Sequence, residues 1–86
     1  IVIEGVKSDV AKKITQAVNI PTIGIGAGNE TDGQVLVWSD MLGFFEDFKP
    51  KFVRHYLNGA KLVKEAVNSY RDDVQTQNFP SKEEEY

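Results

Sequence analysis

The sequence predicts an α/β fold in which two short parallel strands flank one crossover helix and a largely helical C-terminal third follows. Three observations in the 86-residue chain support this fold class. A β-branched run opens the chain, an amphipathic segment occupies residues 9–19, and an apolar run with interspersed glycines covers residues 22–28. The order strand, helix, strand is that of a βαβ unit, whose crossover is almost always right-handed.

The first strand and the first helix are predicted from residue type and spacing. Residues 1–3 are all β-branched and end at Glu4, which indicates a strand buried on both faces, as in a parallel sheet. Ser8 is the expected cap of a helix over residues 9–19, and Pro21 would prevent its continuation. The apolar face of this helix would consist of Val10, Ala11, Ile14, Ala17 and Val18.

The predicted sheet is incomplete. Two parallel strands would leave both hydrogen-bonding edges open and apolar faces uncovered. A compact chain of this mass would expose roughly 5,000 Å². The chain also begins at Ile1, inside an apolar run. We therefore expect residues 1–86 to be a single incomplete domain, completed by strands of a longer parent chain or of another molecule.

The segment after the second strand allows two interpretations. Residues 29–33 form a polar turn, and residues 34–38 have the propensity of a third strand. Alternatively, Asp32 caps a short helix that runs toward Leu42 and ends at Gly43. Five apolar-rich residues do not decide between the two.

The C-terminal half has helical periodicity. Pro50 suits the first turn of a helix that continues to a possible break at residues 58–59. A second helical stretch ends before residues 78–80 and carries one apolar face, made of Val63, Ala66, Val67, Tyr70 and Val74. Phe44, Phe45 and Phe48 precede these helices, and we expect them to pack against another part of the chain or a subunit.

Composition and charge exclude several classes of function. Thirteen acidic and ten basic residues give a net charge of -3 without a basic block, so binding to nucleic acid or to an anionic membrane is not expected. Without cysteine there is no disulfide framework, and one histidine cannot form a zinc site. No apolar run reaches the ~18–20 residues of a membrane span, so we expect a soluble, cytoplasmic protein.

Glu4 is the first candidate catalytic residue. It ends a predicted parallel strand, and catalytic groups of α/β folds gather at the carboxyl ends of such strands. A carboxylate there can serve as a general base, and burial against its apolar neighbours would raise its pKa toward the working range. The alternative is a solvated side chain that opens a loop.

The remaining candidates favour structural roles. The glycines of residues 24–28 lack the third glycine of a dinucleotide-binding motif and the lysine of a P-loop, so close backbone packing is the preferred interpretation. Asp32 and Asp40 do not have the spacing of a calcium loop and are assigned to turns and caps. His55 would lie on a helix surface without a second metal ligand nearby.

A longer string of residues is more specific. Residues 20–28, with the sequence IPTIGIGAG, and residues 32–37, DGQVLV, closely resemble the C-terminal part of the ketopantoate (3-methyl-2-oxobutanoate) hydroxymethyltransferase family. The similarity continues through residues 40–43, 50–53 and 79–80, and so covers nearly the whole chain. The opening residues 1–4 are similar to the strand that carries the family's proton-abstracting glutamate.

This resemblance implies a fold, a reaction and a role for Glu4. The fold would be a (βα)₈ TIM barrel of the phosphoenolpyruvate/pyruvate type, of which the chain would be the last third, with strands seven and eight and the closing helices. Residues 34–38 would then start a helical segment. The enzyme would transfer the one-carbon unit of 5,10-methylenetetrahydrofolate to 3-methyl-2-oxobutanoate on the route to pantothenate and coenzyme A, with Glu4 as the base.

The resemblance also implies Mg²⁺, with ligands on strands outside this chain, and a large homo-oligomer, typically a decamer. The 86 residues alone are expected to be inactive. The chain departs from the family pattern at Lys7, at residues 38–39 and at residues 84–86. Two alternatives remain at this point: another barrel enzyme that uses a metal-bound enolate, and a non-catalytic assembly module.

Overall fold

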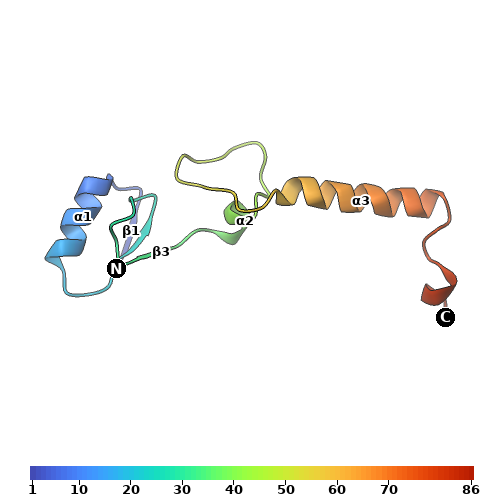
Figure 1. Cartoon of the computed structure of the whole chain (residues 1–86), viewed down its shortest axis with the longest axis horizontal. Helices are drawn as coiled ribbons and strands as arrows, with labels where there is room; N and C mark the ends of the chain where they lie inside the picture. Colours follow the sequence, from blue (N-terminus) through green and yellow to red (C-terminus); the bar gives the residue numbers. More distant parts are fainter.

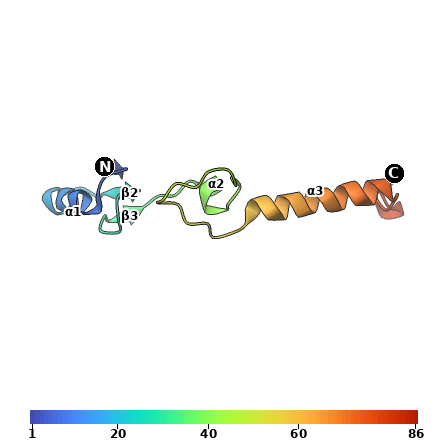
Figure 2. The ribbon, with the colours of Figure 1, turned by 90° about the horizontal axis from the view of Figure 1, so that it is seen from above.

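The structure, a computed structural model, describes all 86 residues and is elongated rather than globular. Its principal extents are 65 × 28 × 13 Å, and its Cα radius of gyration is 21.1 Å. A compact chain of this length would have a radius of gyration of about 12 Å. An α/β unit lies at one end, a looped segment follows, and the long C-terminal helix projects away from both (Figures 1 and 2).

The α/β unit contains a parallel sheet of three short strands. The elements are β1 (Val2–Glu4), α1 (Ser8–Ala17), β2 (Ile23–Ile25) and β3 (Gly33–Gln34), and the strand order is β1-β2-β3. In the register of β1 and β2, Ile3 is opposite Gly24 and Glu4 is opposite Ile25. The predicted strand, helix, strand order is confirmed.

One face of the sheet packs on α1 and the other is bare. Ile3 forms a small core with Ala11 of α1 and Ala27, and each of the three is at most 5% exposed. Their neighbours on the opposite face are open to solvent, since Val2 is 62% and Ile23 is 40% exposed. Burial of the first strand on both faces is therefore wrong for this chain taken by itself, because nothing in it covers the second face.

Two details of α1 differ from the prediction. Lys7, not Ser8, is the residue that caps the helix, and its side chain makes no capping hydrogen bond. Ser8 is the first helical residue. Its Cβ packs against the backbone of Gly28, so a side chain at position 28 would collide with it. The helix ends at Ala17, before residues 18–19.

The segment after β2 combines features of both interpretations. Residues 33–34 form β3 parallel to β2, and a four-residue helix, α2 (Trp38–Met41), follows. The predicted sheet contained two strands, β1 and β2, with an open edge on each. In the structure β3 pairs with the outer edge of β2, so of these two strands only β1 has an open edge. Asp32 does not cap a helix but accepts hydrogen bonds from Thr22. Gly43 follows α2 with φ +68, which is the conformation expected of a helix stop.

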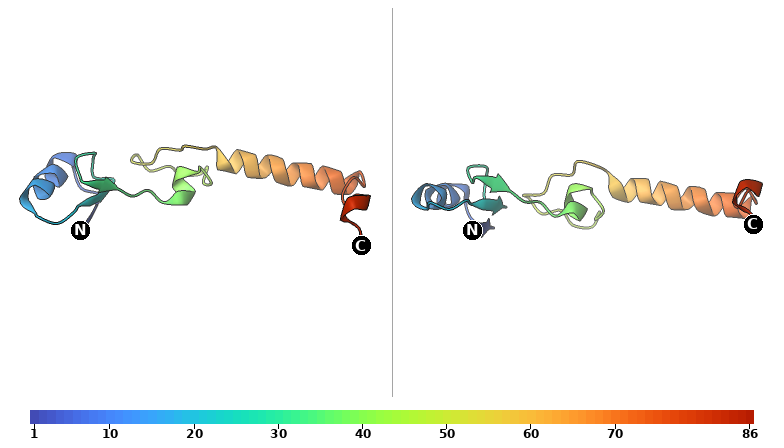
Figure 3. Two further views of the ribbon diagram at one scale, coloured as in Figure 1. Left: turned by 60° about the horizontal axis from the view of Figure 1, so that its bottom comes forward. Right: turned by 90° about the horizontal axis from the view of Figure 1, so that it is seen from below.

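The helix predicted from Pro50 to the possible break at residues 58–59 is absent. Residues 51–58 form turns and extended chain (Figure 3). Within this loop Val53 is buried and His55 is exposed. Backbone groups of the loop bind the α2 region instead: the amide of Tyr56 donates to the carbonyl of Met41 at 2.7 Å. This tertiary pairing replaces the local i, i+4 bonds that a helix would need.

The C-terminal elements are α3 (Gly59–Gln75) and a short 3₁₀ turn, η1 (Lys82–Glu84). The predicted apolar face of α3 is present but uncovered, with Val67 at 59% and Tyr70 at 57% exposure. Of the phenylalanine cluster, Phe44 packs edge-on against Trp38, whereas Phe48 is 74% exposed. The whole chain exposes 7100 Å², well above the roughly 5,000 Å² of a compact chain, so much apolar surface lacks a partner.

Candidate active site at the carboxyl edge of the sheet

Glu4 is the last residue of β1 and lies at the carboxyl edge of the sheet. Side chains alternate across a strand, and Ile3 points toward α1, so Glu4 projects from the bare face together with Val2. Its carboxylate is exposed and makes no ion pair or hydrogen bond within the chain. The burial expected around Glu4 is therefore not provided by this chain, but its predicted position at the strand end is confirmed.

The glycine-rich segment after β2 is shaped by close packing. Gly26 and Gly28 have φ values of +61 and +78, which other residues rarely adopt. A Cβ on Gly28 would lie 2.5 Å from the Cβ of Ser8 and 3.1 Å from its Cα, so α1 approaches the backbone directly. This supports the structural interpretation of these glycines.

A hydrogen-bond network that the sequence did not indicate holds this segment in place. Thr22 is fully buried, and its amide and hydroxyl both donate to one Asp32 carboxylate oxygen, at 2.8 and 3.1 Å. The Asp32 amide donates back to the Thr22 hydroxyl, and Thr15 of α1 joins at 2.9 Å. The network connects helix, strand and loop, and the ten-residue separation of Thr22 and Asp32 matches no local capping pattern.

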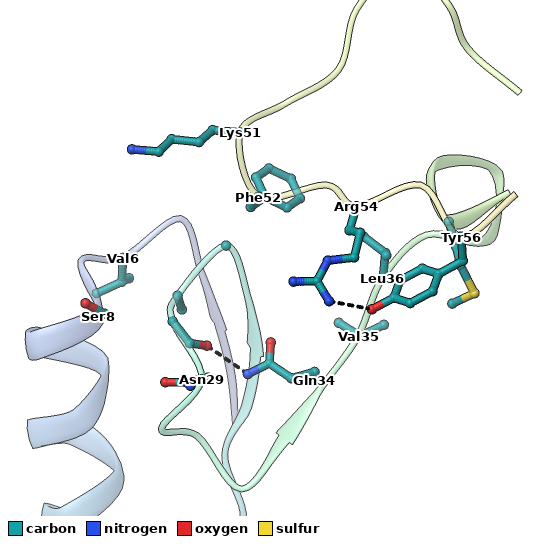
Figure 4. Close-up of a pocket in the computed structure, with 14 residues that line it drawn as sticks. Val6, Ser8, Asn29, Gln34, Val35, Leu36, Lys51, Phe52, Arg54 and Tyr56 are labelled. Carbon is teal, nitrogen blue, oxygen red and sulfur yellow. Dashed lines mark hydrogen bonds between the residues drawn. The ribbon is translucent and has the colours of Figure 1, made fainter. Parts of the chain in front are cut away.

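A groove with a volume of about 1230 Å³ lies beyond the carboxyl ends of β1 and β2. One wall comes from Val6, Ser8 and the glycine-rich segment, and the other from residues 51–56 (Figure 4). Glu4 is two residues from Val6, and Gly26 follows the residue that pairs with Glu4. Glu4 is thus a near neighbour of the groove in sequence and register but is not one of its lining residues.

The charged residues of the groove are Lys51 and Arg54, and none of its lining residues is acidic. The Arg54 guanidinium points into the groove toward Asn29 and Gln34 (Figure 4). It lies 5.9 Å from the centre of the Tyr56 ring and donates one hydrogen bond, at 3.4 Å, to the Tyr56 hydroxyl. The sequence does not reveal these two cations as groove residues, because the spacing from Pro50 to residue 58 predicts a helix.

The chain does not contain a metal site of its own. Nowhere do three or more histidine, cysteine, aspartate or glutamate side chains gather closely enough to hold an ion. Asp40 lies in the first turn of α2, and His55 is exposed in the loop after Val53. Mg²⁺ requires oxygen ligands that converge in near-octahedral geometry, and no such group of side chains is present.

Comparison with known proteins decides the family. The profile of the family described as ketopantoate hydroxymethyltransferase matches residues 1–82, which is nearly the whole chain. The chain belongs to the ketopantoate hydroxymethyltransferase family. Similar proteins named 3-methyl-2-oxobutanoate hydroxymethyltransferase occur in Aliarcobacter butzleri, Nitratiruptor sp. and Helicobacter pylori strain Shi470, with identities of 86%, 72% and 59% over 86 residues.

Each match includes 100% of this chain but only 32%, 33% and 32% of the respective relative. The chain thus spans about a third of the length of these hydroxymethyltransferases. The resemblance found in the sequence is confirmed, and the family is one of transferases that act on small molecules. In the structure of this chain, no helix has the length and the apolar character that crossing a membrane requires.

Proposed function

We propose that this chain is the C-terminal third of a ketopantoate hydroxymethyltransferase that transfers the one-carbon unit of 5,10-methylenetetrahydrofolate to 3-methyl-2-oxobutanoate. The observation that carries the proposal is the family match over residues 1–82, combined with a carboxylate at the carboxyl end of a parallel strand. The chain's share of about a third of its relatives agrees with a fragment of a larger enzyme.

The parent fold in this proposal is a (βα)₈ TIM barrel with β1 and β2 as strands seven and eight. In such a barrel, helices cover the outside and the inner face of each strand is filled by its neighbours. The sheet has this asymmetry, because α1 covers one face and the other, with Val2 and Ile23, is bare. Closure of the ring would require another strand at the edge that β3 now occupies.

Glu4 is the proton-abstracting base in this proposal. Its carboxylate takes the proton from C3 of 3-methyl-2-oxobutanoate, and the C–H electron pair becomes the C2–C3 double bond of an enolate. Water releases the methylene carbon from both folate nitrogens at the oxidation level of formaldehyde: the two C–N bonds break, the water oxygen stays on the carbon, and each nitrogen takes one of the two water protons. C3 of the enolate then bonds to this carbon, and the resulting alkoxide takes back the proton that Glu4 removed, which leaves a hydroxymethyl group and tetrahydrofolate. The open face around Glu4 provides access for a substrate, and the missing strands would exclude water from it.

Other properties of the proposed enzyme depend on groups outside this chain. Mg²⁺, as the family resemblance implies, would take its ligands from other strands, since this segment has no cluster that fits it. A cytoplasmic setting and a homo-oligomer, such as a decamer, are proposed on the same resemblance. The large apolar surface of the chain leaves room for both a completed barrel and subunit contacts.

Glu4→Gln in the complete enzyme tests the proposal. Glutamine keeps the shape of the side chain but cannot accept the proton, so we expect the rate of deuterium exchange at C3 in D₂O, followed by NMR, to fall about 10²–10⁴-fold. Glu65→Gln is the matched control, because Glu65 is an exposed acid on α3. Unchanged exchange in the Glu4 variant would reject the base and leave an assembly role as the better explanation.

The isolated 86-residue chain provides a second test. We expect no ketopantoate formation from it, because most of the proposed barrel is absent. Ketopantoate produced by the purified chain, confirmed by mass spectrometry, would contradict this division of the site.

A further inference from the structure

The loop that leads from Glu4 to α1 is held at both of its ends by the end of β2 and the glycine-rich segment after it. At the start of the loop, the Gly5 amide donates to the carbonyl of Ile25 at 3.0 Å. At its end, Ser8 packs on Gly28 so closely that a Cβ on Gly28 would lie 3.1 Å from the Ser8 Cα. The direction in which the chain leaves Glu4 therefore depends on where the glycine-rich segment lies.

One side chain holds the carbonyl of Gly28. The Gln34 Nε2 atom donates to this oxygen at 2.8 Å, and no other donor in the chain binds it (Figure 4). The same nitrogen donates to the Thr31 Oγ1 atom at 3.0 Å, and the Thr31 hydroxyl donates to the carbonyl of Gly33 at 2.8 Å. A side-chain amide nitrogen carries two hydrogens, and both are used here. Gln34 thus ties the glycine-rich segment to β3.

Gly24 of β2 leaves the space that this arrangement needs. A Cβ on Gly24 would lie 2.8 Å from the Thr31 Oγ1 atom and 3.4 Å from the Gln34 Nε2 atom. The two side chains therefore lie directly over the backbone of the central strand, where Gly24 is opposite Ile3, the residue before Glu4. A glutamine that was only solvated would not require a glycine beneath it.

We propose that Gln34 is a positioning residue for the base, because its hydrogen bond to Gly28 fixes the segment that holds the loop after Glu4. This inference rests on the proposed function of Glu4. Gln34 does not need to touch a substrate in this role, since its effect passes through the two backbone contacts at the ends of the loop. A shift of about 1 Å in a catalytic group can lower a rate about 10²-fold, so one lost bond in this series has a measurable effect.

The kinetics of C3 deuterium exchange in the complete enzyme test this role. Gln34→Leu keeps most of the side-chain volume but removes the donor, so we expect kcat for exchange to fall about 10-fold and the KM for 3-methyl-2-oxobutanoate to change less than about 2-fold. Gln34→Glu should lose as much, because a carboxylate cannot donate to the Gly28 carbonyl. Gln16→Leu, at an exposed glutamine of α1, is the matched control and should change neither constant.

Substitutions at Thr31 separate the hydrogen bonds from packing over Gly24. Thr31→Ser keeps the hydroxyl and should stay within about 2-fold of the wild-type kcat, whereas Thr31→Val keeps the shape and should lower kcat about 3-fold, since Gln34 loses one of its two acceptors. Thr31→Val should add nothing to Gln34→Leu, because the two side chains act through the same bonds. Equal losses in Thr31→Ser and Thr31→Val would overturn the proposal.

Hydrogen exchange at the Gly5 amide gives a readout that does not depend on turnover. Gln34→Leu should speed this exchange about 5-fold, because the bond to Ile25 opens more often, while the Val18 amide, which donates to Ile14 at the end of α1, keeps its wild-type rate. An unchanged Gly5 rate would overturn the proposal. Equal acceleration at Gly5 and Val18 would also overturn it, because it would show general loss of stability.

Failure of this inference differs from failure of the proposed function. If Glu4→Gln stops the exchange at C3 while Gln34→Leu and Gln34→Glu leave kcat unchanged, the base stands and the positioning role is rejected. If the complete wild-type enzyme does not exchange the C3 proton, or if Glu4→Gln leaves that exchange unchanged, the role of Glu4 is rejected and the positioning role with it.

Discussion

The two ends of the molecule differ in how much of their own packing they contain. In the α/β unit, α1 seals one face of the sheet, and the buried Thr22 has every polar side-chain atom satisfied. At the other end, α3 is longer but none of its side chains is buried, and only Gly59 at its first position lacks exposure. The longer helix, α3, therefore has less tertiary packing than the shorter helix α1.

This difference shows where the stability of each region comes from. A helix in water gains little from propensity alone and is held mainly by packing of its apolar face. α1 has that packing from Ile3 and Ala27, whereas the face of α3 that contains Val67 and Tyr70 meets solvent. The α/β unit can be described from its own residues, and α3 requires a surface that the chain does not supply.

Alanine substitutions on the two sides test this contrast most directly. Ile3→Ala should destabilise the α/β unit by about 2–5 kcal/mol, because a buried side chain leaves a cavity, and Val67→Ala should change stability by less than about 0.5 kcal/mol. Amide exchange in the 86-residue chain can measure both: the Gly5 and Ile23 amides, which donate to the carbonyls of Ile25 and Ile1, report on the sheet, and the Thr76 amide, which donates to the carbonyl of Asp72, reports on α3.

The substitutions Ile3→Ala and Val67→Ala can also be compared in the complete enzyme, where α3 has the rest of the protein around it. If the apolar face of α3 is covered there, Val67→Ala should cost roughly 1–3 kcal/mol in denaturant unfolding, while the cost of Ile3→Ala stays similar. A Val67 effect below about 0.5 kcal/mol in both proteins would show that α3 remains unpartnered.

The loop network offers a smaller effect within the α/β unit. Asp32→Ala should destabilise it by about 1–3 kcal/mol, because the amide and hydroxyl of the fully buried Thr22 would lose their shared acceptor. Asp40→Ala is the matched control, since the Asp40 side chain makes no hydrogen bond in α2, and it should stay within about 0.5 kcal/mol. Equal losses in the two variants would argue against the network.

The elements with strong local signals were predictable from sequence. The β-branched run at residues 1–3 and the amphipathic periods of α1 and α3 gave the right type and approximate bounds. The segment from residue 50 to 58 was not, because its apolar spacing fits a helix while its backbone bonds to the α2 region. Such pairing depends on residues far apart in the chain, which periodicity does not report.

The candidate site was predictable only in part. Glu4 was found because a strand end is visible in sequence, and its position is confirmed. The Thr22–Asp32 pair and the Lys51 and Arg54 side of the groove were missed, since each depends on how loops fold against the sheet. Residues that act from loops carry no periodic pattern to reveal them.

The smallest expected effect concerns the ion pair that ties α3 to the central loop. The Lys64 amine donates to a Glu46 carboxylate oxygen at 2.9 Å, and this hydrogen bond, with the charges of Glu46 and Asp47, raises the pKa of Lys64 above 10.5. Glu46→Gln should lower that pKa toward 10.5, as measured by NMR titration of the lysine side chain. Asp47→Asn should lower it less, because Asp47 acts through charge alone.

The sign of this pKa shift fixes its effect on stability. A pKa raised in the folded state means that the pair stabilises fully below 10.5 and that this contribution is lost as pH rises through the raised value. Both side chains are largely exposed, so the contribution is small and ~1 M salt should screen much of it. A Lys64 titration unchanged by Glu46→Gln would show that this ion pair does not form in solution, and that within the chain the start of α3 is held by the Gly59 and Ala60 amides, which donate to the carbonyls of Leu42 and Gly43.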